Sequence, residues 1–379
     1  MPQPSASLES PIRAALSTVD DPEINRPITE LGMVESVTVS EAGVVAVRVL
    51  LTVSGCPMKD KLTRDVTAAV SRVDGVTGVQ VELGVMSDAQ RTELRTKLRG
   101  DAPANEIPFA QPGSRTRVYA VASGKGGVGK SSVTVNIAAA LAAKGLSVGV
   151  VDADIYGFSV PRMLGVTGKP TQVDQMIMPP SAHDVKVISI GMFTPGNTAV
   201  VWRGPMLHRA LQQFLADVFW GDLDVLLMDL PPGTGDIAIS VAQLVPAAEL
   251  LVVTTPQLAA REVAERAGSI ALQTHQQIVG VVENMSWLDM PDGSRMELFG
   301  SGGGQAVADS LAASTGTRVP LLGQIPIDQT VREGGDSGAP VVLTAPDSPA
   351  AQALNAVAET LAARSRSLVG RSLGLTPSR

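Results

Sequence analysis

The sequence predicts an α/β fold in which a large domain with a mainly parallel, doubly wound sheet follows a small α/β domain. Short, continuous apolar runs alternate with helix-like segments through most of the chain, which is typical of parallel strands covered by helices on both faces. A glycine-rich loop joins the first run of the large domain to a helix. Aromatic residues make up only 3% of the chain, which suits closely packed α/β layers.

The small domain is expected within residues 1–99. Two alternating apolar runs are separated by Glu41-Ala42-Gly43, as in a β-hairpin. A helical apolar spacing follows and leads to a further strand pattern. The expected elements are a helix at 12–19, a hairpin at 34–53, a helix at 59–73 and a strand at 76–83.

A stretch rich in Pro, Gly and polar residues, 100–117, is interpreted as an interdomain linker. The large domain follows at 118–365, and we expect 366–379 to be a loose tail. The expected strands of the large domain are 118–123, 146–154, 184–189, 224–230, 249–255, 278–284 and 319–326. Its expected helices extend from the glycine loop to Lys144 and over 205–220, 259–274 and 348–365.

Bulk composition excludes several classes of protein. The formal net charge of −7 argues against a general nucleic-acid-binding surface. Cys56 is the single cysteine, so no intramolecular disulfide can form, as is usual in a reducing compartment. The first residues do not resemble a signal peptide, and no apolar run approaches the roughly 18 residues of a membrane span. We expect a cytoplasmic protein that binds neither nucleic acid nor membrane.

The glycine-rich stretch SGKGGVGKSS, residues 123–132, fits two phosphate-binding motifs at once. Gly124, Gly126 and Gly129 fit the G-x-G-x-x-G dinucleotide fingerprint. Asp152 lies near the place where a ribose-binding acid would fall. A dinucleotide site is therefore one interpretation of this loop.

The second interpretation, a P-loop, is favoured by two features. Lys130 and Ser131 complete G-x-x-x-x-G-K-[ST], in which the lysine neutralises phosphate oxygens and the hydroxyl binds Mg²⁺. Asp229 ends the apolar run DVLLMDL, where P-loop proteins hold Mg²⁺. Alone, Asp229 would be interpreted as a turn or capping residue. Together with the loop it predicts a nucleoside triphosphate with Mg²⁺, and hence a P-loop NTPase domain.

The choice between ATP and GTP depends on what recognises the base. The usual guanine-reading motif, N-K-x-D, does not occur in the sequence. Asn284 ends the apolar run IVGVVEN, a position from which an amide can read a base edge, although a strand-end asparagine also serves structural purposes. We expect ATP.

Further motifs resemble those of a known family. GKGGVGKSS resembles the deviant P-loop of MinD and ParA ATPases, which carries an additional lysine where Lys125 stands. Over about 118–361, the segments VDADIYGFSVPRMLG, WRGPML, DLPPGTGD, ENMS, FGSGGG and IPIDQTVREGGDSGAP resemble the Mrp/ApbC family of ATP-hydrolysing iron–sulfur cluster carriers. DPEINRPITELGMVESV and SGCPMKD resemble the small domain of iron–sulfur cluster assembly proteins.

The resemblance implies a role for each matching loop residue. Lys130 would act in catalysis at the β- and γ-phosphates, with the loop amides around it. The residues implied in nucleotide binding are Gly124, Lys125, Gly126, Gly127, Val128, Gly129, Lys130, Ser131, Ser132 and Asn284.

The resemblance also implies catalytic and metal-binding residues. Lys125 would reach across a homodimer to the partner's nucleotide and stabilise transition-state charge, the alternative being a solvated loop lysine. Asp154 would orient the attacking water. Ser131 and Asp229 would form the Mg²⁺ site, together with Asp152, whose alternative role is to order the segment around it.

The sequence departs from the family pattern at one place. The family usually carries C-x-x-C after the asparagine strand, whereas 290–293 reads Met-Pro-Asp-Gly. A [4Fe–4S] cluster takes about four thiolates, and a homodimer of this chain offers only Cys56 from each copy. Cys56 precedes an expected helix, where a thiol is activated; a small buried residue is the alternative.

We expect an ATP-binding and ATP-hydrolysing carrier that binds iron–sulfur clusters, including a [4Fe–4S] cluster, and transfers them to apoproteins as a homodimer. One alternative is a MinD- or ParA-like positioning ATPase, which needs an amphipathic tail or a basic DNA-binding face. The other is a nucleotide-gated assembly scaffold that binds no cluster, which the missing C-x-x-C favours.

Overall fold

The computed structural model describes most of the chain as two compact units. Unit 1 comprises Met1–Ala104, Gly168–Pro180 and Asp217–Gly221, and unit 2 comprises Asn105–Thr167, Ser181–Ala216 and Asp222–Arg379. The described residues are 4–24, 26–52, 58–99, 106–111, 113–155, 157–193, 204–233, 236–257, 268–269 and 271–364.

Unit 1 is built on a three-stranded sheet of order β1-β2-β3, in which β2 pairs antiparallel with β1 and parallel with β3. Val45, Val47 and Val49 alternate along β2 and are fully buried, so one face of the sheet carries the core. The elements are α1 (Pro4–Leu16), β1 (Val34–Val39), β2 (Val44–Leu51), α2 (Lys59–Val70), β3 (Gly78–Val85) and α3 (Asp88–Arg99).

The sequence patterns predicted this hairpin and third strand but not α3. Half of the residues of that helix, DAQRTELRTKLR, are charged. Leu94 is its buried apolar residue, so the apolar spacing is weak. Unit 1 also includes a small hairpin of β6 (Thr171–Val173) and β7 (Met176–Met178). Its Val173 and Met176 belong to the same buried cluster as the core of the sheet.

Unit 2 contains a nine-stranded, mainly parallel sheet of order β13-β12-β11-β4-β10-β5-β9-β8, with β14 pairing parallel with β12. Only β8 and β13 run antiparallel to their neighbours among these pairings. The strands are β4 (Arg117–Ala122), β5 (Val148–Asp152), β8 (Ser181–Ala182), β9 (Val185–Ser189), β10 (Val225–Asp229), β11 (Glu249–Thr254), β12 (Ile278–Asp289), β13 (Arg295–Met296) and β14 (Leu321–Ile327). The predicted α/β fold with a mainly parallel sheet is confirmed.

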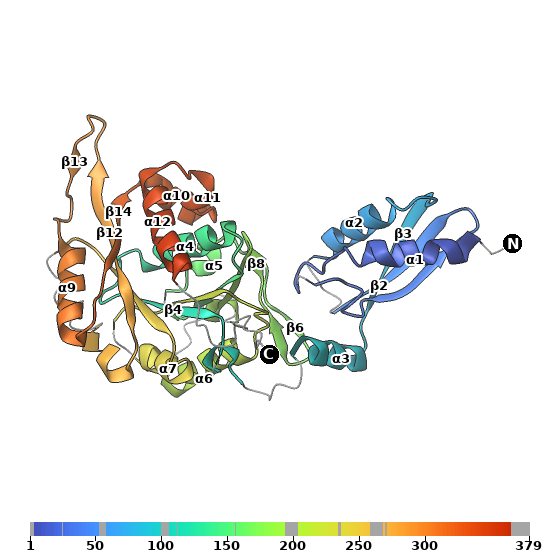
Figure 1. Ribbon diagram of the computed structural model, residues 1–379, viewed down its shortest axis with the longest axis horizontal. Coiled ribbons are helices and arrows are strands. Elements are labelled where there is room, and N and C mark those ends of the chain that lie inside the picture. The colour runs from blue at the N-terminus through green and yellow to red at the C-terminus, as the bar shows by residue number, and fades with distance from the viewer. Residues whose placement is uncertain are drawn as a thin grey trace, which may run out of the picture. The chain divides into compact units, whose positions relative to one another are not determined.

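Helices cover both faces of this sheet, with α4 and α12 on one side and α6 and α7 on the other (Figure 1). They are α4 (Lys130–Ala143), α5 (Val160–Met163), α6 (Gly204–Ala216), α7 (Asp236–Leu244), α9 (Gly303–Thr315), α10 (Gln329–Ser337), α11 (Val341–Thr344) and α12 (Pro349–Ala363), with short 3₁₀ turns at Pro108–Ala110 and Ile190–Met192. Most of the predicted helix 259–274 lies outside the described residues, as does the predicted tail 366–379.

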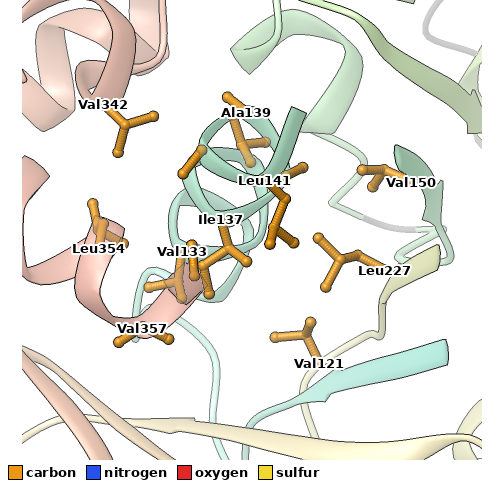
Figure 2. Packing of buried hydrophobic residues seen from close by; sticks show 14 of the residues in the cluster. Val121, Val133, Ile137, Ala139, Leu141, Val150, Leu227, Val342, Leu354 and Val357 are labelled. Atoms are coloured by element: carbon orange, nitrogen blue, oxygen red, sulfur yellow. The ribbon is translucent and has the colours of Figure 1, made fainter. Parts of the chain in front are cut away.

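The helix α4 lies at the centre of the unit 2 core. Every residue from 133 to 142 is buried, because the sheet covers one side of the helix and α11 and α12 cover the other. Figure 2 shows Ile137 and Leu141 packed among Val150 and Leu227 of the sheet and Leu354 of α12. This enclosure fixes the first turn of α4, and therefore the glycine loop before it.

Parallel register brings the carboxyl ends of the central strands together at one edge of the sheet. Asp152, the last residue of β5, is paired in register with Asp229, the last residue of β10, and with Ser189 at the end of β9. The glycine loop leaves β4, the next strand beyond β10, at the same edge. Loops at this edge of an open α/β sheet form the usual ligand site.

The glycines of FGSGGG allow α9 to begin directly against the sheet. A Cβ at Gly303 would collide with the backbone of Pro256, and one at Gly304 would collide with the side chain of Glu283. The Gly304 amide donates to the buried Glu283 carboxylate, which also accepts a 2.7 Å hydrogen bond from Gln324. This motif therefore has a packing role.

We predict that Ile137→Ala lowers the free energy of unfolding of unit 2 by about 2–5 kcal/mol, because it leaves a cavity in the enclosed core beneath the glycine loop. Urea denaturation followed by circular dichroism measures the change. Leu343→Ala is the matched control, since Leu343 is 37% exposed, and we expect it to cost less than about 1 kcal/mol. Equal losses in the two variants would contradict the described packing of α4.

Candidate nucleotide site

The glycine loop turns sharply between β4 and α4. Gly127 and Gly129 have φ values of +79° and +77°, in the left-handed region that glycine adopts without strain. A Cβ at Gly129 would also collide with the side-chain amide of Asn284, whereas a Cβ at Gly127 would meet nothing within 4 Å. Asn284 supports the loop directly, because its Nδ2 donates a 2.9 Å hydrogen bond to the carbonyl oxygen of Val128.

The carboxylate of Asp229 holds the first turn of α4. Its Oδ1 lies 2.8 Å from Lys130 Nζ and accepts a 2.9 Å hydrogen bond from Thr134 Oγ1, while Oδ2 accepts one of 2.6 Å from Ser131 Oγ. The Asp229 side chain is fully buried and that of Lys130 is 6% exposed. Thr134 was not singled out from the sequence, although its position one helical turn after Lys130 is the available signal.

Two buried donors at the loop lack hydrogen-bond partners among the described residues. Lys130 Nζ makes the ion pair with Asp229 but no well-directed hydrogen bond, and Ser123 Oγ has no partner. Unpartnered buried polar groups are rare, because each costs free energy unless a ligand or water satisfies it. Their place at the positive end of α4 fits an anion.

The Asp152 carboxylate accepts hydrogen bonds from the segment that follows β5. Its Oδ1 accepts from the Asp154 amide at 3.2 Å, and its Oδ2 accepts from the Ser159 amide at 3.1 Å and from Ser189 Oγ at 3.2 Å. Burial, reinforced by the nearby Asp229 charge, raises the pKa of Asp152 to about 7. These contacts support the alternative in which Asp152 orders the segment; a Mg²⁺ role for it stays a prediction.

A cavity of about 240 Å³ lies between the loop and the segment after β5. Its lining includes Ser123, Lys130 and Ser131 from the loop and Asp154 from the segment after β5. Asp154 Oδ1 accepts a 3.0 Å hydrogen bond from the Gly157 amide, which holds the carboxylate at this wall. The structure therefore brings Asp154 to the same small cavity as the P-loop residues.

The Lys125 side chain contacts Gln257, a residue outside the described lining of the small cavity. Its Nζ donates a hydrogen bond to Oε1 of Gln257, just beyond β11, and it does not belong to the described lining of the 240 Å³ cavity. Gln257 has no sequence motif that would have indicated this contact. Lys125 is thus half-buried at the surface of the loop, beside its own phosphate site.

A second cavity, of about 640 Å³, adjoins the first, and both are lined by Gly129, Ser132, Ser159 and Met163. Asn284 also lines it, so the predicted base-reading residue lies next to the P-loop. The remaining wall is largely apolar and includes Met285, Leu298, Phe299, Ile327 and Val331. Its volume is within the usual range for a small-molecule site.

Cys56 lies outside the described residues, so its surroundings are not part of the structure. Within the described ranges, no group of three or more His, Cys, Asp or Glu side chains is placed to hold a metal ion. In the same part of the chain, no helix has both the length and the apolar character to cross a bilayer.

Comparison with known proteins agrees with the geometry. Residues 114–362 match the family described as NUBPL iron-transfer P-loop NTPase, and residues 9–83 match one described as iron-sulfur cluster assembly protein. The first match covers most of the chain. The chain therefore belongs to the family of iron-transfer P-loop NTPases.

Relatives extend over both units. An iron-sulfur cluster carrier protein of Mycobacterium tuberculosis is 66% identical over 98% of this chain and 98% of its own. A protein of the same name from Deinococcus radiodurans is 46% identical over 92% of this chain and 93% of its own. Among solved structures, a nucleotide-binding protein from Archaeoglobus fulgidus in complex with ADP is 36% identical, with a TM-score of 0.51, over 59% of this chain and 87% of its own.

We predict that Gly129→Ala destabilises the nucleotide-free protein more than Gly127→Ala does. Both variants carry the strain of a left-handed alanine, about 1–2 kcal/mol, but only Gly129→Ala also displaces the Asn284 amide. Thermal unfolding without nucleotide compares them. Equal unfolding temperatures would show that Asn284 does not pack against the loop as described.

Proposed function

We propose that the protein binds and hydrolyses ATP with Mg²⁺ and carries iron–sulfur clusters to apoproteins. The single observation that supports ATP binding best is the arrangement around Asp229. A buried lysine and a hydroxyl on the first turn of α4 meet a carboxylate at the end of a neighbouring strand, beside the Ser123 hydroxyl, which has no partner among the described residues. That arrangement fits a triphosphate with its metal ion.

The donor set fits Mg²⁺, which prefers hard oxygen ligands. Ser131 Oγ and Asp229 Oδ2 are 2.6 Å apart, and together they offer a hydroxyl and a carboxylate at the end of the loop. Ser131 would hold the ion, and Asp229 would orient it from behind. When bound, Mg²⁺ neutralises phosphate charge during transfer. Lys130 would then turn from Asp229 toward the β- and γ-phosphate oxygens.

Hydrolysis requires a water placed in line with the terminal phosphate. Asp154 lines the same small cavity as the loop residues and accepts a hydrogen bond from the Gly157 amide, so its carboxylate would orient that water. Asp152 supports Asp154 by accepting a hydrogen bond from its backbone amide. The two carboxylates thus have separate roles, one at the water and one in the support of the segment.

Lys125 would act in a homodimer. Within one chain it contacts Gln257 and does not join the described lining of the small cavity, so a role at the phosphates is best met from a second copy. There it would stabilise transition-state charge as an arginine finger does. The contact with Gln257 would hold the lysine until the partner arrives.

The carrier function is supported by the names of the relatives. Proteins 66% and 46% identical to this chain, over nearly all of its length, are called iron-sulfur cluster carrier proteins. The cargo would be a cluster such as [4Fe–4S], with Cys56 as the thiol that each copy supplies. The clients would be apoproteins of the cytoplasm.

A nucleotide-gated scaffold that binds no cluster is the second candidate. The observation that favours it is the shortage of thiolates, because the chain has one cysteine and no C-x-x-C. A positioning ATPase of the MinD or ParA kind has no such specific support.

We predict that Lys130→Ala weakens ATP binding by about 10- to 150-fold, because it removes charge-assisted hydrogen bonds to the phosphates. Lys125→Ala, at the other loop lysine, is the matched control. It should keep ATP affinity and lose turnover by about 10³-fold if it acts across a dimer. Calorimetry and phosphate release measure the two effects. Since Lys130→Ala also leaves Asp229 unpaired, circular dichroism must first show a folded variant. Tight ATP binding by the folded Lys130→Ala chain would overturn the assignment of the loop.

We predict that anaerobic reconstitution with iron and sulfide loads a cluster on the wild-type chain and much less on Cys56→Ala. The visible absorbance of the cluster and its iron content measure loading. Cys56→Ser, which keeps size and polarity, separates loss of the thiol from loss of packing. Equal loading of all three chains would remove Cys56 as a ligand, and no loading of any would favour the scaffold.

A further inference from the structure

The strand β12 extends well beyond the nucleotide site. Its apolar run was predicted to end at Asn284, but the strand continues to Asp289 and returns through β13. We call residues 285–299 the arm. The turn at its tip is closed by two hydrogen bonds, from the Met290 amide to the Ser294 carbonyl and from the Gly293 amide to the Met290 carbonyl. The arm projects beyond the rest of the sheet (Figure 1).

Both ends of the arm line the 640 Å³ cavity. The chain leaves the cavity at Met285, directly after Asn284, and comes back to it at Leu298 and Phe299. The same cavity adjoins the phosphate site, because Gly129 and Ser132 line both. The residues at which the arm enters and leaves the cavity, Met285, Leu298 and Phe299, are called its roots, and the cavity that they line offers space for a nucleoside beside the phosphate site.

The roots have the features of a surface that a ligand completes. Leu298 is 52% exposed and Phe299 is 39% exposed, although both line a cavity. Met285 adopts φ +60°, a conformation that is strained for a long side chain, and the pairing of β12 with β14 shifts register between Asn284 and Leu288. Such strain is characteristic of ligand-binding segments.

The charged side chains that line the cavity already have partners. Arg162 and Arg332 both pair with Asp336, at 3.4 Å and 3.2 Å. The Asp328 carboxylate accepts a 2.8 Å hydrogen bond from the Thr330 amide at the start of α10. The aromatic and apolar side chains of the arm roots are then the natural partners of an uncharged ring.

We propose that the nucleobase packs on the Phe299 ring between the arm roots, so that nucleotide binding fixes the position of the arm. Leu298 and Met285 complete the apolar contact. The inference deepens the proposed ATP binding and rests on it. The inference gives the arm a function that needs no cysteine. When the nucleotide site is occupied, the position of the arm is fixed, including its tip at 290–294.

The test compares two ligands that share phosphates but not a nucleoside: ATP and inorganic tripolyphosphate, each with Mg²⁺, titrated by calorimetry. Phe299→Ala should weaken ATP binding by about 5- to 150-fold, the usual effect of losing a base–aromatic stack. It should leave the affinity for tripolyphosphate unchanged. Phe299→Tyr, which keeps the ring, should restore ATP affinity. Met296→Ala is the matched control, because Met296 is 43% exposed on the arm but does not line the cavity.

The outcomes separate this inference from the proposed function. Equal ATP affinity in wild type and Phe299→Ala overturns the inference alone. A parallel loss of ATP and tripolyphosphate affinity also overturns it, because the effect would then arise at the phosphates. A wild-type chain that binds neither ligand overturns the proposed function, and the inference with it.

Trp287 reports on the arm itself. It lies on β12 beneath the Arg295 guanidinium, which is 4.0 Å from the ring centre. ATP should change the tryptophan fluorescence of the wild type, and Trp287→Phe should abolish most of that change. Tripolyphosphate should produce little change in either chain. An equal response to both ligands would show that the arm does not sense the nucleoside.

Discussion

The buried carboxylate of Asp229 is the interaction on which the rest of the site depends. It is fully buried at the end of a central strand and contacts Lys130, Ser131 and Thr134 on the first turn of α4. A buried charge that loses its partners costs several kcal/mol, so this carboxylate and lysine hold each other in place. The loop is therefore shaped before any nucleotide arrives.

The parallel sheet sets a second constraint, because it places Asp152 and Asp229 side by side. Two adjacent buried carboxylates repel each other, and the site resolves this by dividing their tasks. Asp229 is compensated by the lysine and hydroxyls of α4. Asp152, whose pKa is raised to about 7 by burial and by its neighbour, is surrounded by backbone amides of the segment that carries Asp154. Asp152 thus supports the segment, while Asp229 holds the first turn of α4.

The sequence was sufficient for the features that depend on local pattern. The glycine loop, the apolar strands and the carboxylate at the end of β10 each follow from spacing and residue type. Other features depend on tertiary approach and leave no local pattern. Thr134 matters because α4 lies against β10, and Gln257 because Lys125 reaches it. Phe299 belongs to the segment FGSGGG, yet its position at the 640 Å³ cavity follows only from the return of the arm. The mostly polar helix α3 was missed because its apolar spacing is weak.

The arm and the loop together suggest how one chain links a nucleotide to a distant surface. Asn284 donates a hydrogen bond to the loop and immediately precedes the arm in β12. A change at the phosphate loop therefore has a short route to the arm, through one hydrogen bond and the backbone that follows. This geometry is present whether or not the arm carries thiols.

The central claim is that the glycine loop grips a triphosphate with its magnesium ion. Titration calorimetry of the purified full-length chain, with ATP in the presence and absence of Mg²⁺ and with NADH in parallel, tests it most directly. We predict that ATP binds once per chain, that removal of Mg²⁺ weakens the binding strongly, and that NADH gives no heat. Saturable binding of NADH by a chain that ignores ATP would contradict the claim and restore the dinucleotide interpretation of the loop.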